Sequence, residues 1–198
     1  MEKFIKPRLL TPSGQSHKKF WQAAGLCALT AAIFFLPFYL LDGGFFHYAG
    51  DFNSQQISFY RYMNGFVKGA GYPDSAFAGA PRNTFSWATD LGSGVMNAYS
   101  FYLYGSPFFW LSVLLPQSWL PYMMVPLLVL KFGVAGGGAY LYLRRYVKNA
   151  NYAVLGACLY ALSGFAVYNV FFNHFVDVVA LFPYLLWALD EAIYEDRH

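Results

Sequence analysis

Long apolar runs, separated by short polar links, set the pattern of this chain. No charged residue occurs from Phe20 to Leu41. A helix over this run would be roughly 33 Å long, enough to cross a hydrocarbon core of about 30 Å. The run is longer than the apolar part of a signal peptide, and no small-residue cleavage site follows it. We therefore predict an uncleaved transmembrane helix over 20–41.

Three later apolar runs predict three more transmembrane helices. They cover residues 121–143, 152–172 and 175–191. The first of them ends at a pair of arginines, and the last ends at two acidic residues. The links between these runs are short, so we expect neighbouring helices to be antiparallel.

A shorter apolar run from Pro107 to Leu115 is too short to span the membrane. Pro116 closes it, which favours a re-entrant or interfacial helix. The alternative is a span over 107–130, but the remaining residues 133–143 would then be too short to cross. We prefer the first interpretation.

The segment 42–120 forms a long loop between the first two predicted spans and contains an amphipathic pattern over 54–68. Phe59, Met63 and Phe66 share one helical face, whereas Arg61 falls on the opposite face. Such a helix either lies on the membrane surface or docks on the rest of the protein. Both interpretations stay open.

Composition excludes a soluble domain. The chain is 58% hydrophobic and only 12% charged, against about 25% charged residues in ordinary soluble domains. The apolar content excludes disorder, and two cysteines cannot form a disulfide framework. The net charge of +3 is too small to indicate nucleic-acid binding. The predicted fold class is an all-α integral membrane protein with about four transmembrane helices and a long outer loop.

Basic residues predict the orientation. They cluster in the N-terminal segment 1–19 and in the link after residue 143. Because cytoplasmic segments are enriched in lysine and arginine, both clusters are expected on the cytoplasmic side. The loop 42–120 is then outside, and the tail 192–198 is cytoplasmic.

Two acids in the outer loop are candidates for chemistry. Asp51 lies between the first span and the amphipathic segment, which places a carboxylate near the outer membrane surface. A helix cap or a turn acid is the simpler alternative. Asp90 precedes Gly92 and Gly94, which permit a tight backbone close to a ligand. This run lacks the third glycine of a dinucleotide fingerprint.

Lys131 lies near the middle of the second predicted span. A lysine there costs about 2.5–3.5 kcal/mol on insertion scales, so we expect it to face a partner or a wet cavity. A phosphate and a structural carboxylate are both possible partners. Gly133 and Gly137 form a small-residue face that lets another helix approach.

His174 and Asp177 are three residues apart, at the predicted outer turn before the last span. They fall on one helical face. One interpretation is helix capping, with Asn173 as the cap. The other is a polar wall that faces the same outer cavity as Asp51.

Several loose motifs together resemble the N-terminal portion of the YfhO-type bacterial membrane proteins, a family of GT-C-like glycosyltransferases. The resemblance covers about residues 20–190. Its motifs are Gly50-Asp51 followed by Gln55 or Gln56, residues 90–94, residues 104–108, Lys131 with its glycine run, and residues 160–164.

The resemblance implies transfer of a sugar from a polyprenyl-phosphate carrier to a cell-wall polymer, such as lipoteichoic acid, on the outer face of the bacterial cell membrane. Asp51 would be the catalytic residue, which acts as the base or orients the acceptor. The candidate substrate-binding residues are Gln55, Arg61, Arg82, Asp90, Lys131, His174 and Asp177. Family members are longer, so the resemblance also implies that this chain is an N-terminal portion, inactive alone. We predict no metal site, because no pair of acids has a chelating spacing, and the sequence indicates neither a cofactor nor an oligomeric state.

Two other functions are weighed against this one. A transporter or flippase-like bundle would carry polar groups along several spans and show internal repeats. A non-catalytic membrane subunit would bind partners through its glycine and aromatic faces. The polar groups of this chain concentrate in the outer loop, which favours the enzyme.

Overall fold

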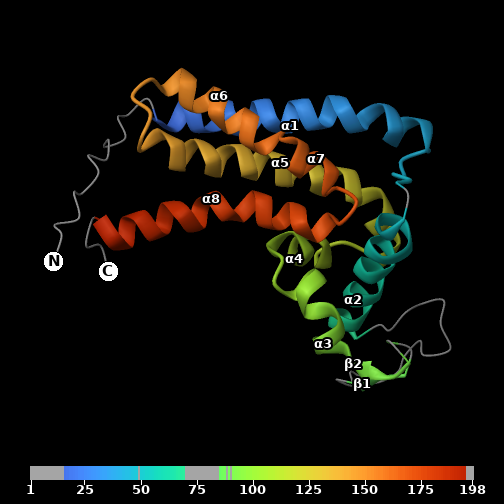
Figure 1. Ribbon diagram of the computed structural model, residues 1–198. Coiled ribbons are helices and arrows are strands. Elements are labelled where there is room, and N and C mark those ends of the chain that lie inside the picture. The colour runs from blue at the N-terminus through green and yellow to red at the C-terminus, as the bar shows by residue number, and fades with distance from the viewer. Residues whose placement is uncertain (1–15, 49, 70–84, 88, 90, 195–198) are drawn as a thin grey trace. The chain divides into compact units, whose positions relative to one another are not determined.

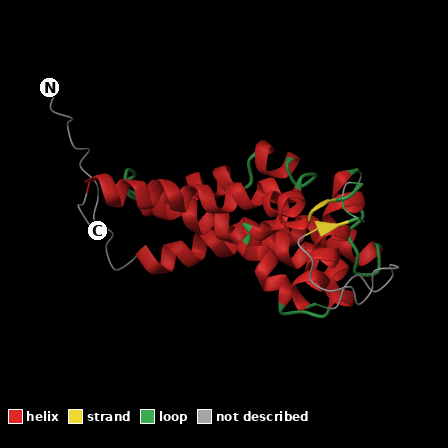
Figure 2. Cartoon of the chain, turned by 90° about the horizontal axis from the view of Figure 1, so that it is seen from below, coloured by secondary structure: helices red, strands yellow, loops and turns green. Residues whose placement is uncertain are grey.

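The computed structural model describes residues 16–48, 50–69, 85–87, 89 and 91–194. Helices account for nearly all of the regular structure (Figure 1). The strands β1 (Phe85–Ser86) and β2 (Ser93–Gly94) pair antiparallel, with Phe85 opposite Gly94. Figure 2 shows this pair as the one strand feature among the helices of the described residues. The predicted all-α membrane class is confirmed.

The chain divides into two compact units. The first unit comprises Met1–Phe34, Val129–Tyr168 and Val178–His198. The second unit comprises Phe35–Leu128 and Asn169–Asp177. Most of the predicted outer loop thus folds as a unit of its own.

Apolar helices build the first unit. They are α6 (Ala150–Ala161) and α7 (Gly164–Tyr168), together with most of α1 (Ser16–Leu41), α5 (Leu120–Arg144) and α8 (Asn173–Tyr194), whose residues 35–41, 120–128 and 173–177 belong to the second unit. Three segments of the described chain are long and apolar enough to cross a membrane, namely His17–Leu41, Gln117–Arg144 and Ala150–Tyr168. The protein is therefore a multi-pass membrane protein. Because α5 runs without interruption, the alternative span over 107–130 is wrong.

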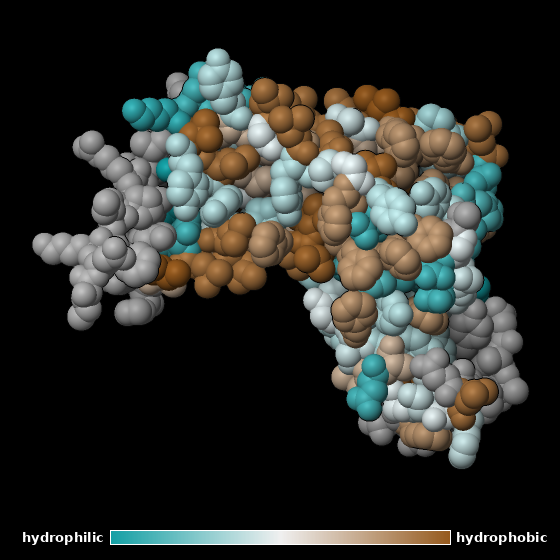
Figure 3. Space-filling view, viewed as in Figure 1, coloured by the Kyte–Doolittle hydropathy of each residue, from teal (hydrophilic) through white to brown (hydrophobic). Residues whose placement is uncertain are grey.

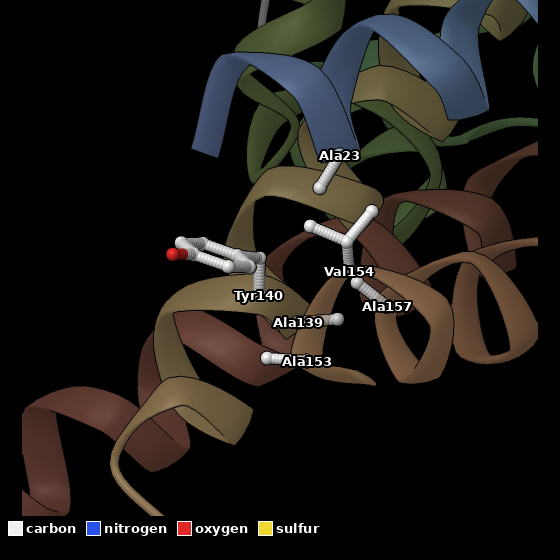
Figure 4. Packing of buried hydrophobic residues seen from close by; sticks show 6 residues of the cluster. All are labelled: Ala23, Ala139, Tyr140, Ala153, Val154 and Ala157. Atoms are coloured by element: carbon white, nitrogen blue, oxygen red, sulfur yellow. The ribbon is translucent and has the colours of Figure 1, made fainter. Parts of the chain in front are cut away.

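The glycines of α5 let its neighbours approach closely, as predicted. A Cβ atom at Gly136 would lie 2.5 Å from the Cys27 sulfur on α1. A Cβ atom at Gly138 would lie 2.4 Å from the Tyr184 ring on α8. A buried hydrophobic cluster, mostly of alanines, continues this packing on the side of α6 (Figure 4). The cluster consists of Ala23, Ala139, Tyr140, Ala153, Val154 and Ala157.

The third predicted span is not one continuous helix. The sequence predicts a helix over 152–172, but α6 ends at Ala161 and α7 ends at Tyr168. The break has a local cause, because the Ser163 hydroxyl accepts a hydrogen bond from the Ala166 backbone N–H at 3.3 Å. Serine is a preferred N-cap, so it starts a new helix here.

Helix α8 contains the fourth predicted span, over 175–191. It has 22 residues, but it carries Asp177 near its start and Asp190 and Glu191 near its end. It is not among the three segments that qualify as spans. The fourth span therefore stays a prediction.

Charged residues tie the end of α5 to the last turns of α8. Arg145 is buried, and its Nε atom lies 3.7 Å from Asp190 Oδ2. The same guanidinium also pairs with Glu191. Apolar side chains cover the exposed faces nearby, as Figure 3 shows over α6 and α8. Leu155 and Leu185 are among these exposed residues, and in a membrane protein such faces contact lipid.

The second unit is built from short helical segments. They are η1 (Phe52–Ile57), α2 (Ser58–Lys68), α3 (Val95–Tyr99), η2 (Ser100–Tyr104), α4 (Pro107–Val113) and η3 (Gln117–Trp119). Both η1 and η2 are wide π-helical segments, whereas η3 is a tight 3-10 turn.

Helix α2 docks on the rest of the second unit. It contacts α4 and η3, and its buried side chains are those of Tyr60, Met63 and Asn64. Asn64 Nδ2 donates a 2.9 Å hydrogen bond to the Ser112 carbonyl at the end of α4. Of the two interpretations left open for this segment, docking is supported. Lys68 is engaged in the same contact, because its ammonium group donates to the Leu115 carbonyl.

Candidate functional site

A tight turn places Asp51 at the start of η1. Gly50 has φ +71°, and a Cβ atom there would lie 2.3 Å from the Phe171 ring. Only glycine satisfies both conditions, because other residues rarely adopt this backbone conformation and would overlap the ring. The Asp51 side chain makes no capping hydrogen bond to η1. It instead accepts a 3.3 Å hydrogen bond from Gln55 Nε2. The carboxylate is half-buried at the beginning of a π-helical segment.

A buried polar stripe runs along η1 and α2. Gln56, Tyr60 and Asn64 are 0%, 1% and 0% exposed. They follow one another at intervals of four residues, so they share one helical face. The stripe was missed from the sequence, where the aromatic face of this segment is the stronger pattern. The spacing of the three residues was the available signal, but it does not distinguish an inward face from an outward one.

Gln56 contacts His174, which lies in the first turn of α8. Gln56 Nε2 lies 3.2 Å from His174 Nδ1, and both residues are buried. The imidazole is surrounded by aromatic rings, with centroids at 4.6 Å for Tyr102, 5.0 Å for Phe101 and 4.5 Å for Phe175. Phe101 and Tyr102 belong to η2, so the two π-helical segments meet at His174. Such π-helical turns are frequent at functional sites.

Tyr60 extends the polar contact toward α8. Its hydroxyl group is hydrogen-bonded to the side chains of Ser106 and Asn173. Burial raises the pKa of Tyr60 well above its usual range, and the charge of Asp177 raises it further. The two hydrogen bonds oppose this rise only in part. Tyr60 is therefore a neutral phenol that joins α2, the start of α4 and the start of α8.

His174 and Asp177 thus lie against the η1–α2 segment, in the unit that also contains Asp51. Asn173, His174 and Asp177 are all buried. Helix capping and a polar wall that faces the same cavity as Asp51 therefore both stay predictions.

Residues 26–198 match the family described as bacterial membrane protein YfhO. The chain belongs to this family. Comparison with curated proteins and with solved structures finds no match. As a YfhO-family membrane protein, the chain has the lipid bilayer as a partner.

Of the four remaining candidate residues of this YfhO-family chain, the structure describes Arg61 and Lys131. Arg61 is half-buried on α2, and its carbonyl accepts a 2.7 Å hydrogen bond from Gln117 Nε2. Lys131 is fully buried in α5, within the first unit. Arg82 and Asp90 lie outside the described residues. Among the residues that the structure describes, no group of three or more histidine, cysteine or acidic side chains could hold a metal ion.

Proposed function

We propose that this YfhO-family chain is part of a membrane glycosyltransferase that moves a sugar from a polyprenyl-phosphate carrier to a cell-wall polymer such as lipoteichoic acid. The observation that carries the proposal is the half-buried Asp51 carboxylate, held by Gln55 on the turn made by Gly50. A carboxylate in this position can accept the proton of an acceptor hydroxyl within about 3 Å.

Binding of the sugar phosphate is assigned to the remaining candidates. Gln55, His174 and Asp177 belong to the unit that contains Asp51. Arg61 and Arg82 supply positive charge for the leaving phosphate, and Asp90 supplies a second carboxylate. Preorganised positive groups stabilise the charge that develops on a leaving group. The reaction takes place at the outer membrane surface, since a charged sugar phosphate is unstable in hydrocarbon. This placement rests on the proposed cytoplasmic N-terminus.

The test is replacement of Asp51 by Asn in the intact gene, followed by measurement of sugar on the cell-wall polymer. Removal of the base is expected to lower transfer by a factor of roughly 10²–10⁴. Asp42 offers a matched control, because it is a partly exposed acid paired with His47 at 3.0 Å in the same unit. Asp42→Asn is expected to keep transfer near the wild-type level.

Protein abundance in the membrane is measured for both variants. Undiminished glycosylation by Asp51→Asn at normal abundance would remove Asp51 as the base and would favour a non-catalytic membrane subunit. Equal loss in both variants would also contradict the proposal, because it would indicate a general effect of acid removal in this unit.

A further inference from the structure

The link between α5 and α6 and the last turn of α5 carry three basic residues whose surroundings differ. Arg145 is 4% exposed and pairs with Asp190 and Glu191 at the end of α8. Arg144 is half-buried and Lys148 is exposed, and neither forms an ion pair within the described part of the chain. We infer that Arg144 and Lys148 bind the phosphate group of an anionic phospholipid at the end of two membrane spans. This site lies in the first unit, so it is independent of the proposed function, whose base lies in the second unit.

Arg145 occupies the described acids that would otherwise compensate this positive charge. Its Nε atom lies 3.7 Å from Asp190 Oδ2, and the same guanidinium donates to Glu191 Oε1. Asp190 also accepts a hydrogen bond from the Tyr146 hydroxyl group. These carboxylates serve a buried guanidinium, and a buried charge that loses its partner is strongly destabilising. The two acids therefore hold α8 against the end of α5, and the other two basic residues are left for an external anion.

Arg144 is held at the link by a contact with the backbone. Its Nη1 atom donates a 2.9 Å hydrogen bond to the carbonyl oxygen of Val147, the residue before Lys148. This bond uses one of the five N–H donors of a guanidinium. The planar guanidinium binds phosphate oxygens through paired N–H groups, whereas the lysine ammonium acts as a point charge. The two side chains thus place two positive charges within five residues of chain.

The link lies at the depth where phospholipid headgroups are found. One span, Gln117–Arg144, ends directly before it, and another, Ala150–Tyr168, begins directly after it. Exposed tyrosines mark the same region, because Tyr146 is 45% exposed and Tyr152 is 67% exposed. Tyrosine is enriched at membrane–water interfaces, where its ring and its hydroxyl group meet apolar and polar surroundings. The basic side chains of this region therefore face headgroup phosphates.

An apolar stripe on α6 begins beside the link and offers a surface for acyl chains. Leu155 is 55% exposed and Leu159 is 68% exposed. Together with Tyr152 they are spaced by three and four residues, so the three side chains share one face of α6. A phospholipid at this position has cations for its phosphate and an apolar surface for its chains.

This combination favours an anionic phospholipid over other phosphate-containing ligands. A soluble phosphate would use the two cations but not the apolar stripe on α6. Phosphatidylcholine would use the stripe, but its own ammonium group already neutralises its phosphate. An anionic phospholipid uses both parts, because basic residues near a membrane surface attract its uncompensated negative charge.

Binding is tested on the whole chain in detergent by native mass spectrometry, with phosphatidylglycerol and phosphatidylcholine as the added lipids. The wild type is expected to bind the first phosphatidylglycerol more tightly than the first phosphatidylcholine. Arg144→Gln and Lys148→Gln are each expected to weaken phosphatidylglycerol binding about fivefold, which is the contribution of one basic residue at a membrane surface. Binding of phosphatidylcholine should stay the same in both variants, because it does not depend on these charges.

Lys68→Gln is the matched control, because Lys68 is an exposed lysine of α2 in the other unit and the change removes the same charge. It is expected to keep the wild-type affinity for phosphatidylglycerol, and Lys148→Arg, which conserves the charge, should keep it as well. Thermal melting of each variant separates loss of binding from unfolding. Wild-type affinity in the double variant Arg144→Gln with Lys148→Gln, or an equal loss in Lys68→Gln, would overturn the inference.

Soluble glycerol 1-phosphate distinguishes a lipid site from a site for free phosphate. Because it lacks acyl chains, it is expected to leave phosphatidylglycerol bound when both are present at equal concentration. Displacement of the lipid under these conditions would overturn its assignment as the ligand. None of these measurements involves sugar transfer, so a failure of the proposed function would leave this site standing.

Discussion

Gly50 is the residue on which the position of Asp51 most directly depends. It combines φ +71° with the Phe171 ring in the space of a side chain. Gly43 has a similar φ of +64°, but a Cβ atom placed there would have no neighbouring atom within 4 Å. Replacing each of the two glycines by alanine therefore distinguishes the cost of backbone strain from the cost of steric overlap within the same unit.

We predict that Gly50→Ala destabilises the protein more than Gly43→Ala does. Both replacements introduce backbone strain of about 1–3 kcal/mol. Gly50→Ala adds overlap with Phe171, and such overpacking typically costs a further ~1–3 kcal/mol. The measurement is the midpoint of thermal unfolding in detergent. Adding Phe171→Ala to Gly50→Ala should remove the cost of the steric overlap but not that of the backbone strain. Equal midpoints for Gly50→Ala and Gly43→Ala would contradict the prediction.

A second prediction at this scale concerns Tyr60. Its raised pKa means that the folded state keeps the phenol protonated, whereas the same group in the unfolded chain ionises at about pH 10. The unfolded state then binds fewer protons, so stability falls as pH rises above about 10. Tyr60→Phe is expected to cost about 1 kcal/mol at neutral pH through its lost hydrogen bonds.

The same variant should lose less stability than the wild type between roughly pH 9 and pH 11, since it lacks this group. Denaturant unfolding at several pH values measures both effects. Tyr62→Phe, on the same helix, is the control for tyrosine loss in general. Parallel pH profiles for wild type and Tyr60→Phe would contradict the assignment.

At the scale of elements, the packing of α1 against α6 brings two cysteines together. Cys27 Sγ and Cys158 Sγ lie 3.8 Å apart, although 131 residues separate them in the chain. Each stands within an apolar run of the sequence, where a free cysteine usually packs as a small apolar residue. Their proximity provides a direct chemical test of the helix arrangement.

We predict that mild oxidation with copper phenanthroline links Cys27 to Cys158 within one chain. The two thiols give two electrons to the copper oxidant and two protons to the solvent, and both become unreactive to maleimide. Cys27→Ala and Cys158→Ala should each keep one reactive thiol under the same conditions. A disulfide between two chains, or two persistent thiols in the wild type, would contradict the packing of α1 beside α6.

At the scale of the whole molecule, the distribution of basic residues bears on orientation. Arg145 counts toward the predicted cytoplasmic cluster, yet it is buried and paired with Asp190 and Glu191. Lys148 is exposed close by. The N-terminal segment 1–15 lies outside the described residues, so the proposed orientation still depends on the basic clusters of the sequence.

We predict that Lys148 faces the cytoplasm and that Asn97, which is exposed on α3, faces outward. Single cysteines at these positions, in a chain whose Cys27 and Cys158 are replaced by Ala, report the orientation. A membrane-impermeant maleimide should label Asn97→Cys on intact cells and Lys148→Cys only after permeabilisation. The reverse pattern would invert the topology and would place the proposed site in the cytoplasm.

Much of the fold could be predicted from the sequence, because its main determinants act locally. The length of an apolar run measures its ability to cross the bilayer, so residues 20–41 and 121–143 were found within a few positions of α1 and α5. Pro116 closed a short helix as expected, and α4 ends at Val113. Ser163 was the exception, because its capping bond outweighed an otherwise continuous apolar run.

The sequence by itself determined that this is an all-α, multi-pass membrane protein. Only the tertiary structure decided which polar residues meet. Gln56 and His174 are 118 residues apart in the chain, and no local periodicity indicates that α8 begins beside η1. The physical reason is that the length of an apolar run, which decides whether it can cross the bilayer, is a property of one segment alone. A buried hydrogen bond needs two segments to be placed together.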